Sequence, residues 1–211
     1  MKKRTKNSRG RATRERIIDA TIQVLAVDGL SGVTTQRLTE QVGMTQPGFY
    51  RHFSSTDECV IAAAERIGKR IREAIEKDRA MHNIGRPVGT IDDLAEHFDQ
   101  MLRLIRREWQ FFLLLQQYRL QTNPLGVALN QVYCGIHEDL VQHLQAGSAA
   151  AGIEGIAKPS YKRLADMILS TIFSVGTREA KRSVTIRKAA AKELSLMCYA
   201  ASRAVYLGVI E

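Results

Sequence analysis

The sequence predicts an all-α protein of about nine helices. Three observations predict this fold class. Apolar residues recur at helical spacing through most of the chain, no segment alternates apolar and polar residues for long enough to form a convincing strand, and proline occurs only four times in 211 residues. With 45% hydrophobic and 25% charged residues, the chain can bury a core, which argues against a disordered or a membrane protein.

The first three helices are short, and local signals mark their ends. We expect them at about 13–27, 35–42 and 46–52. Thr34 and Thr45 precede the second and third helices as N-caps, because a hydroxyl oxygen can accept a hydrogen bond from an N–H group of the first turn. Gly29 and Gly43 follow the first and second helices, where glycine readily adopts the left-handed conformation that ends a helix.

Six further helices follow. The fourth is expected over about 57–81, which corresponds to roughly 40 Å at 1.5 Å per residue. The fifth opens at a Thr90–Asp93 capping box, and Asn123 caps the seventh. Small residues in 147–158 predict a loop. The remaining helices are expected at about 90–105, 109–120, 124–145, 160–181 and 186–209.

Most of the positive charge lies at the N-terminus. The net charge is +9, and residues 1–53 hold ten lysines and arginines against four acids, which leaves +6 in the first quarter of the chain. Such an excess favours an acidic partner, either nucleic acid or an anionic membrane surface. Residues 1–10 have no large apolar side chain after Met1, so we expect a flexible basic arm. This arm either contacts phosphates or the minor groove of DNA, or stays solvated.

Other function classes lack their sequence signals. The cysteines, Cys59, Cys134 and Cys198, are far apart in sequence, which argues against a disulfide framework and a zinc site. No apolar run approaches the length of a membrane span, and the N-terminus lacks the apolar run of a signal peptide, so we expect a cytoplasmic protein. The nucleophile-elbow, phosphate-loop, dinucleotide-binding and zinc-protease motifs are missing, so we expect neither an enzyme nor a cofactor.

The second and third helices, joined at Gly43, form a helix–turn–helix unit. In such a unit the later helix, here 46–52, enters the major groove of DNA, while the earlier one, here 35–42, lies across the backbone. Thr45 and Gln46 lie at the N-terminal end of the 46–52 helix, which points at base edges, whereas Tyr50 and His52 can donate to phosphates. The candidate DNA-facing residues of this helix are Thr45, Gln46, Gly48, Tyr50, Arg51 and His52.

Many positions around this unit recur at fixed spacing in one known family. They lie within TRERIIDATIQVLAVDGLSGVTTQRLTEQVGMTQPGFYRHFSS, and they include Ile18, Ala20, Gly29, Thr34-Thr35, Leu38, Val42-Gly43, Thr45 and Phe49-Tyr50-Arg51-His52-Phe53. Over about residues 11–70 the chain resembles the DNA-binding domain of the TetR family of bacterial transcriptional regulators. Two positions depart from the family pattern. Thr56 stands where the family usually has a phosphate-binding lysine, and Pro47-Gly48 stands where it often has glycine followed by Thr, Ala or Ser.

The resemblance implies an all-α homodimer that reads a palindromic operator in double-stranded DNA. It implies a basic arm at 1–10, a TetR-type domain at 11–71 with its helix–turn–helix motif at 34–53, and a domain at 72–211 that binds a small-molecule effector and forms the dimer. The family touches DNA at the positions of Thr35, Thr45, Gln46, Gly48, Tyr50 and His52. We add Arg51, which can reach either a phosphate or a base, and Thr56, where the family's phosphate contact is either weakened to a hydroxyl or replaced by the basic arm. The basic residues Arg9, Arg11 and Arg14 are further candidate contacts.

Aromatic and apolar residues of the C-terminal helices could line a pocket for a hydrophobic effector, or could simply be core. The candidates are Phe98, Met101, Trp109, Phe112, Tyr118, Tyr133, His137 and Phe173. Phe173-Ser174-Val175-Gly176 and the last helix resemble TetR-family members that sense fatty acyl thioesters.

The last two helices suit a dimer interface. Leu194, Met197, Cys198, Ala201, Ala204 and Val205 recur at helical spacing, although the same stripe could pack within one chain. Two helix–turn–helix units, one from each chain, must lie about 34–36 Å apart to reach successive major grooves, so the function requires a dimer. We call each such unit a DNA-reading head. Effector binding would shift the fourth helix and release the DNA, as in a repressor. The alternative is a basic helical protein that binds nucleic acid without sequence preference.

Overall fold

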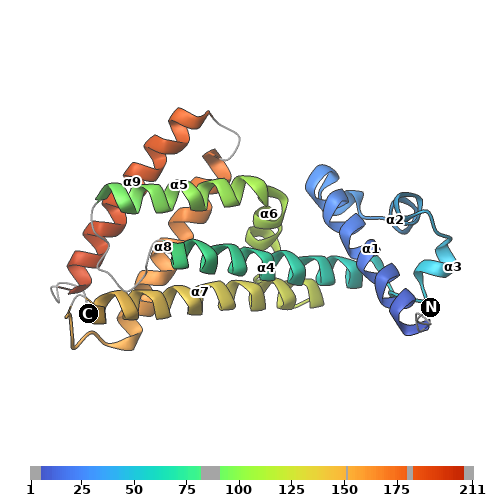
Figure 1. The fold of residues 1–211 in the computed structure, drawn as a ribbon, viewed down its shortest axis with the longest axis horizontal. Helices are drawn as coiled ribbons and strands as arrows, with labels where there is room; N and C mark the ends of the chain where they lie inside the picture. Colours follow the sequence, from blue (N-terminus) through green and yellow to red (C-terminus); the bar gives the residue numbers. More distant parts are fainter. Residues whose placement is uncertain (1–5, 82–90, 151, 180–182, 207–211) are drawn as a thin grey trace. The chain divides into compact units, whose positions relative to one another are not determined.

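The computed structural model describes residues 6–81, 91–150, 152–179 and 183–206, and every regular element in these ranges is helical, so the predicted fold class is confirmed (Figure 1). The elements are α1 (Lys6–Asp28), the 3-10 helix η1 (Leu30–Gly32), α2 (Thr35–Val42), α3 (Gln46–Phe49), α4 (Thr56–Met81), α5 (Ile91–Arg107), α6 (Trp109–Tyr118), α7 (Pro124–Ala150), α8 (Lys158–Glu179) and α9 (Val184–Tyr206). None of the described helices is both long and apolar enough to cross a membrane.

Local capping residues fix the short helices where the sequence predicts them. The Thr34 hydroxyl accepts a hydrogen bond from the backbone N–H of Arg37 at 3.2 Å, and the Thr45 hydroxyl accepts one from the N–H of Gly48 at 3.3 Å. Gly43 ends α2 in the left-handed conformation, with φ of 70° and ψ of 49°. These caps satisfy backbone groups that a helix end otherwise leaves without partners.

Two helix boundaries in the N-terminal region differ from prediction. α1 begins at Lys6, so residues 6–10, which were expected in a flexible arm, are helical. A helix anchored by a packed segment can extend past its last buried residue at little cost, because each added residue forms one backbone hydrogen bond. α3 ends at Phe49, and the next turn is tighter, with the N–H of His52 donating to the carbonyl of Phe49 at 2.8 Å.

The end of α7 was also predicted wrongly. The expected loop began at Gly147, but α7 continues to Ala150. Ser148 is fully buried there, and its hydroxyl donates to the carbonyl of Leu144 at 3.0 Å. Burial of Ser148 therefore accompanies the extension of the helix through this segment. The predicted cap at Thr90 lies outside the described residues.

The chain divides into two compact units. The first contains Met1–Arg70 and Leu113–Val132, and the second contains Ile71–Phe112 and Tyr133–Glu211. In the first unit, α1 packs against α2, and α2 against α3. Its most deeply buried side chains include Ile17, Leu38, Phe49, Leu115 and Leu129.

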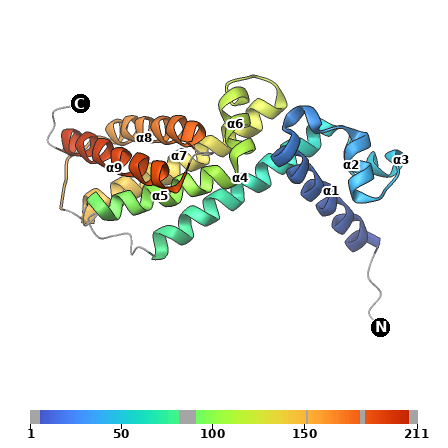
Figure 2. The same cartoon turned by 90° about the horizontal axis from the view of Figure 1, so that it is seen from above.

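In the second unit α5, α8 and α9 pack against one another (Figure 2). Gly176 of α8 makes this close packing possible, because a Cβ atom there would lie 2.5 Å from Cδ1 of Ile105 on α5. Leu164, Leu194 and Ile105 are almost completely buried. Burial of these side chains stabilises the unit by roughly 1.5–3 kcal/mol each.

Candidate functional site

A small aromatic core holds the short helix α3 in place. Phe49 is completely buried, and its ring centroid lies 6.1 Å from that of Phe53. Phe49 also meets Tyr50 edge-to-face at 5.3 Å. Because Phe49 points inward, the neighbouring Tyr50 faces solvent. The position of this four-residue helix is therefore fixed by the packing of Phe49, because so short a helix is not stable by itself.

Polar contacts fasten α2 to α1. The guanidinium of Arg16 donates to the backbone carbonyl of Val42 at 2.5 Å, which satisfies a carbonyl at the C-terminal end of α2. The amide of Gln41 donates to Gln23 at 2.5 Å. These contacts leave the outer face of α2 and the start of α3 as the free surface of the helix–turn–helix unit.

The structure brings the predicted DNA-facing side chains onto one unit. Tyr50 is 55% exposed, and its hydroxyl lies 3.5 Å from the hydroxyl of Thr35 at the start of α2. Hydroxyl groups at this position can donate to DNA phosphates, as can the N–H groups of a helix start. Among the other candidates, Thr45, Gln46 and Arg51 are exposed, and Thr35, Gly48 and His52 are half-buried.

Gly48 lies close to the cap of its own helix. A Cβ atom on Gly48 would lie 3.2 Å from the Thr45 hydroxyl oxygen and 3.3 Å from Cε of Met44. A larger side chain would therefore crowd the hydrogen bond that begins α3. The absence of a side chain also lets another molecule approach the backbone here.

The candidate arginines of α1 differ in their surroundings. Arg9 and Arg11 are exposed on the helix. Arg14 instead lies over the ring of Phe53, 4.4 Å from its centroid, and 3.9 Å from the carboxylate of Glu58. This cation–π contact and the ion pair engage Arg14 with residues of its own unit.

The start of α4 carries a cap that the sequence analysis missed. The Ser55 hydroxyl accepts a hydrogen bond from the N–H of Glu58 at 3.2 Å, and the Glu58 carboxylate accepts bonds from the N–H of Ser54 at 2.7 Å and its hydroxyl at 2.9 Å. The backbone hydrogen bond from Ser54 lowers the pKa of Glu58 despite the opposing effect of burial. The signal was the serine–glutamate spacing of a capping box. Thr56, the predicted phosphate contact, is half-buried beside this cap.

Arg66 ties α4 to α1 within the first unit. One terminal nitrogen donates to Asp19 at 2.7 Å, and the other pairs with Glu15. Two acceptors on one face of α1 fix the direction of the guanidinium. A change in the course of α4 would therefore carry α1 with it.

Four of the predicted effector-pocket residues form one aromatic cluster in the second unit. The ring of Phe173 lies 5.2 Å from that of Phe112 and 6.1 Å from that of Tyr133, and Tyr133 stacks on His137 at 6.3 Å. The Nε2 atom of His137 lies 3.2 Å from the carboxylate of Asp166. Phe98, Met101 and Trp109 belong to the same unit, whereas Tyr118 belongs to the first unit.

The predicted stripe on α9 faces two ways. Leu194 and Cys198 are buried within the chain, whereas Met197 is 58% exposed. Between α8 and α9 lies a cavity of about 170 Å³, lined in part by Val175 and Met197. The large exposed apolar side chains of α8 and α9 are Met167, Val184, Ile186, Leu196, Met197 and Tyr199.

Comparisons with known proteins agree with this geometry. Residues 17–63 match the bacterial regulatory proteins of the tetR family. Over 103 residues the chain is 28% identical to the class D tetracycline repressor protein of Escherichia coli and to the class H protein of Photobacterium damsela subsp. piscicida. Each match spans 49% of this chain and 35% of the relative, so it covers about a third of those proteins.

Solved structures extend the likeness of fold to most of the chain. A candidate TetR-family regulator from Mesorhizobium loti is similar with a TM-score of 0.72 and 14% identity, over 91% of this chain and 97% of that one. Bacillus subtilis FadR in complex with stearoyl-CoA is similar with a TM-score of 0.63 and 19% identity, over 93% of this chain and 99% of that one. Salmonella enterica GusR is similar with a TM-score of 0.63 and 20% identity, over 96% of this chain and 100% of that one. Residues 17–63 of this chain therefore match the helix–turn–helix region of the TetR family of bacterial regulatory proteins, and the fold of the chain is similar to that of solved TetR-family regulators.

Proposed function

We propose that this protein is a ligand-responsive transcriptional regulator that binds a palindromic DNA operator as a homodimer and, as a repressor, releases it when a small hydrophobic effector binds. One observation carries the proposal: the capped helix–turn–helix unit presents Thr45, Gln46, Tyr50 and Arg51 to solvent, with Phe49 buried beneath them. The family match of residues 17–63 covers this unit.

In the DNA complex, α3 would enter the major groove with its N-terminal end toward the bases. Gln46 can then form paired hydrogen bonds with an adenine edge. Tyr50 and Thr35 would donate to the phosphate backbone, since their hydroxyls lie close together and outward. The exposed Arg9 and Arg11 of α1 would add phosphate contacts. We propose domains at 11–71 for DNA and 72–211 for effector binding and dimerisation.

A dimer supplies the second reading head that a palindrome needs. We propose that α8 and α9 form the interface, because apolar side chains such as Met167, Leu196 and Met197 stay exposed along them. Exposed apolar surface of this kind marks interaction sites. A two-fold axis through these helices would place the same surface of each chain against its partner.

We propose a long-chain acyl-CoA as the effector class. The largely buried aromatic cluster of Phe112, Tyr133, His137 and Phe173 gives an apolar region with a polar edge at His137, which suits an acyl chain joined to a polar group. The fold is similar to that of Bacillus subtilis FadR, whose structure is described in complex with stearoyl-CoA.

Release of DNA would pass through α4. This helix has its first part, to Arg70, in the first unit and its later part, from Ile71, in the second. Arg66 binds the first part to Asp19 of α1, so a shift of α4 would move the head. A change in the spacing of the two heads would then prevent both from reaching their grooves.

Selection of bound genomic fragments tests this proposal. The purified protein is mixed with fragmented bacterial DNA, and bound fragments are sequenced with and without stearoyl-CoA. We expect a small set of fragments that share a palindrome and that are lost when stearoyl-CoA is added. Recovery of fragments without a common motif would contradict the proposal. A common palindrome that stearoyl-CoA leaves bound would contradict the effector class alone.

A further inference from the structure

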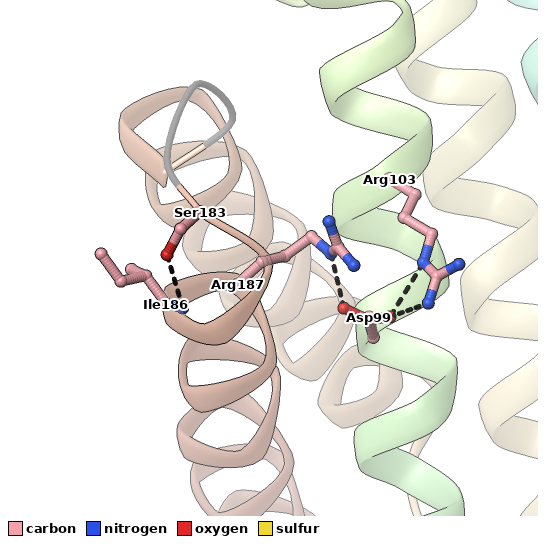
Figure 3. Close-up of polar contacts among 5 residues, drawn as sticks. All are labelled: Asp99, Arg103, Ser183, Ile186 and Arg187. Atoms are coloured by element: carbon pink, nitrogen blue, oxygen red, sulfur yellow. Dashed lines mark hydrogen bonds and ion pairs between the residues drawn. The ribbon is translucent and has the colours of Figure 1, made fainter.

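A buried carboxylate in the second unit is shared by two arginines. Asp99 of α5 has a side chain only 3% exposed, and its Oδ1 atom accepts a hydrogen bond from Nε of Arg187 on α9 at 2.6 Å (Figure 3). Its Oδ2 atom accepts from Nε and Nη2 of Arg103 at 2.9 and 2.6 Å. Burial alone would raise the pKa of Asp99, but the hydrogen bonds from Arg187 and Arg103 hold it below its ordinary value. We call these three residues the Asp99 cluster.

The Asp99 cluster carries an excess positive charge. Guanidinium groups stay protonated in proteins, so two arginines against one carboxylate leave a net charge of +1. Arg187 also lies in the first turn of α9, which begins at Val184, and the helix dipole adds partial positive charge at that end. Asp99 balances the buried Arg187, so the excess charge lies on Arg103, whose side chain is 55% exposed. The cluster therefore presents a positive charge on its solvent-facing side, where an anion can approach.

The two arginines also keep hydrogen-bond donors available. The Arg187 side chain is 91% buried, and its Nε–H donates to Asp99, whereas no group among the described residues accepts a hydrogen bond from its two terminal amino groups. Nη1 of Arg103 is likewise without an acceptor in the described parts of the chain. Asp99 holds both guanidinium groups, one at each of its oxygens (Figure 3). Asp99 therefore holds the remaining N–H donors of Arg187 and Arg103 close together.

We propose that the Asp99 cluster is a binding site for an oxyanion, a phosphate or carboxylate group, held by the amino groups of Arg187 and Arg103. The planar amino groups of arginine match the oxygen spacing of both anions. The Arg103 side chain is 55% exposed and gives access from solvent. The buried Arg187 strengthens the interaction, because electrostatic attraction is less screened away from water. This site does not depend on the proposed binding of DNA.

Titration with inorganic phosphate tests the site, with chloride adjusted to keep ionic strength constant. We expect saturable binding by calorimetry and a saturable rise in melting temperature. Arg103→Gln should weaken phosphate binding by about tenfold, the loss of one charge-assisted hydrogen bond. Arg106→Gln, an exposed arginine of the same helix, is the matched control and should bind as the wild type does. The absence of saturable binding, or equal weakening in both variants, would overturn the proposal.

A second variant and two further anions sharpen the test. Arg187→Lys keeps the positive charge but removes the planar pair of amino groups, so we expect loss of phosphate binding in the folded variant. Unchanged binding by folded Arg187→Lys would overturn the role of Arg187. If this variant does not fold, the comparison of Arg103→Gln with Arg106→Gln decides. Acetate and coenzyme A identify the source of the anion. Tighter binding of coenzyme A, lost in Arg103→Gln, assigns the site to a phosphate of a larger ligand, whereas preference for phosphate or acetate assigns it to a free anion.

Discussion

Arg72 on α4 donates two hydrogen bonds to the carboxylate of Asp139 on α7, from Nε at 2.7 Å and from Nη2 at 2.9 Å. The guanidinium lies over Gly135, where a Cβ atom would be 3.2 Å from Nη1. The hydrogen bond from Arg72 to Asp139 raises the pKa of Arg72. Because α7 also carries Tyr133 and His137 of the aromatic cluster, this pair joins the proposed effector site to α4.

Breaking this pair should uncouple effector binding from DNA release. In the wild type we expect stearoyl-CoA to weaken DNA binding by about 5- to 150-fold. In Arg72→Lys and Asp139→Asn we expect unchanged DNA affinity without effector and a smaller response to it, because the two-pronged contact is lost. Fluorescence anisotropy with labelled operator measures both. Lys77→Gln, an exposed charge on α4, is the control. A full response in both variants would refute the coupling, whereas a wild type without response refutes the effector.

Gln46 and Tyr50 should affect DNA binding in different ways. Gln46→Ala should reduce discrimination between the operator and single-base variants by roughly 1–3 kcal/mol, because a base-specific contact is lost. Tyr50→Phe should weaken binding to every sequence by about fivefold, the value of one hydrogen bond to the backbone. Binding measured against a panel of operator variants separates the two effects. A changed base preference in Tyr50→Phe would mean that the roles are assigned wrongly.

The exposed arginines of α1 should contribute to the salt dependence of DNA binding. If Arg9 and Arg11 each neutralise one phosphate, replacing both with glutamine should reduce the slope of log affinity against log salt by about 1.8. Substitution is preferable to deletion, because α1 begins at Lys6 and a truncation would remove its first turns. An unchanged slope would indicate that both side chains remain solvated in the complex.

Substitution of Gly43 should destabilise the protein because of its backbone conformation and not because of a steric clash. No heavy atom lies within 4 Å of a Cβ placed there, but its φ is 70°. Gly43→Ala should lower the free energy of unfolding by about 1 kcal/mol, and Gly43→Asn by less, because asparagine tolerates this conformation. Gly10→Ala, which also meets no neighbour but lies within α1, should instead stabilise the protein by about 0.5 kcal/mol. Urea unfolding measures all three, and equal effects at both glycines would contradict this account.

The exposed apolar surface of α8 and α9 should control the oligomeric state. Met197→Asp places a charge in the proposed interface, so we expect sedimentation as a monomer and weaker operator binding. Val127→Asp changes another exposed apolar residue, on α7, and should leave the dimer intact. A dimer that persists in Met197→Asp would place the interface elsewhere.

The sequence predicts those parts of the structure that depend on near neighbours. The ends of α2 and the start of α3 follow from Thr34, Gly43 and Thr45, each of which acts within three or four residues. The start of α1 and the end of α7 were missed, because helices extend cooperatively beyond what local composition suggests.

Contacts between distant residues could not be predicted. Asp99 and Arg187 are 88 positions apart, and each alone resembles an ordinary surface charge. The same holds for Arg14, whose position over Phe53 depends on the fold of the whole unit. The helix–turn–helix unit that carries the predicted DNA-facing residues could be foreseen because a short motif specifies it, whereas the partners of buried charges depend on tertiary packing.

The ratio of two DNA affinities tests the central claim most directly. The dissociation constant is measured for the selected operator and for a shuffled duplex of the same length and composition, at the same salt concentration. A sequence-specific regulator should bind the operator at least about 10³-fold more tightly, and two chains should occupy each palindrome. A ratio near one at every salt concentration would contradict the account and would identify a basic protein that binds nucleic acid without sequence preference.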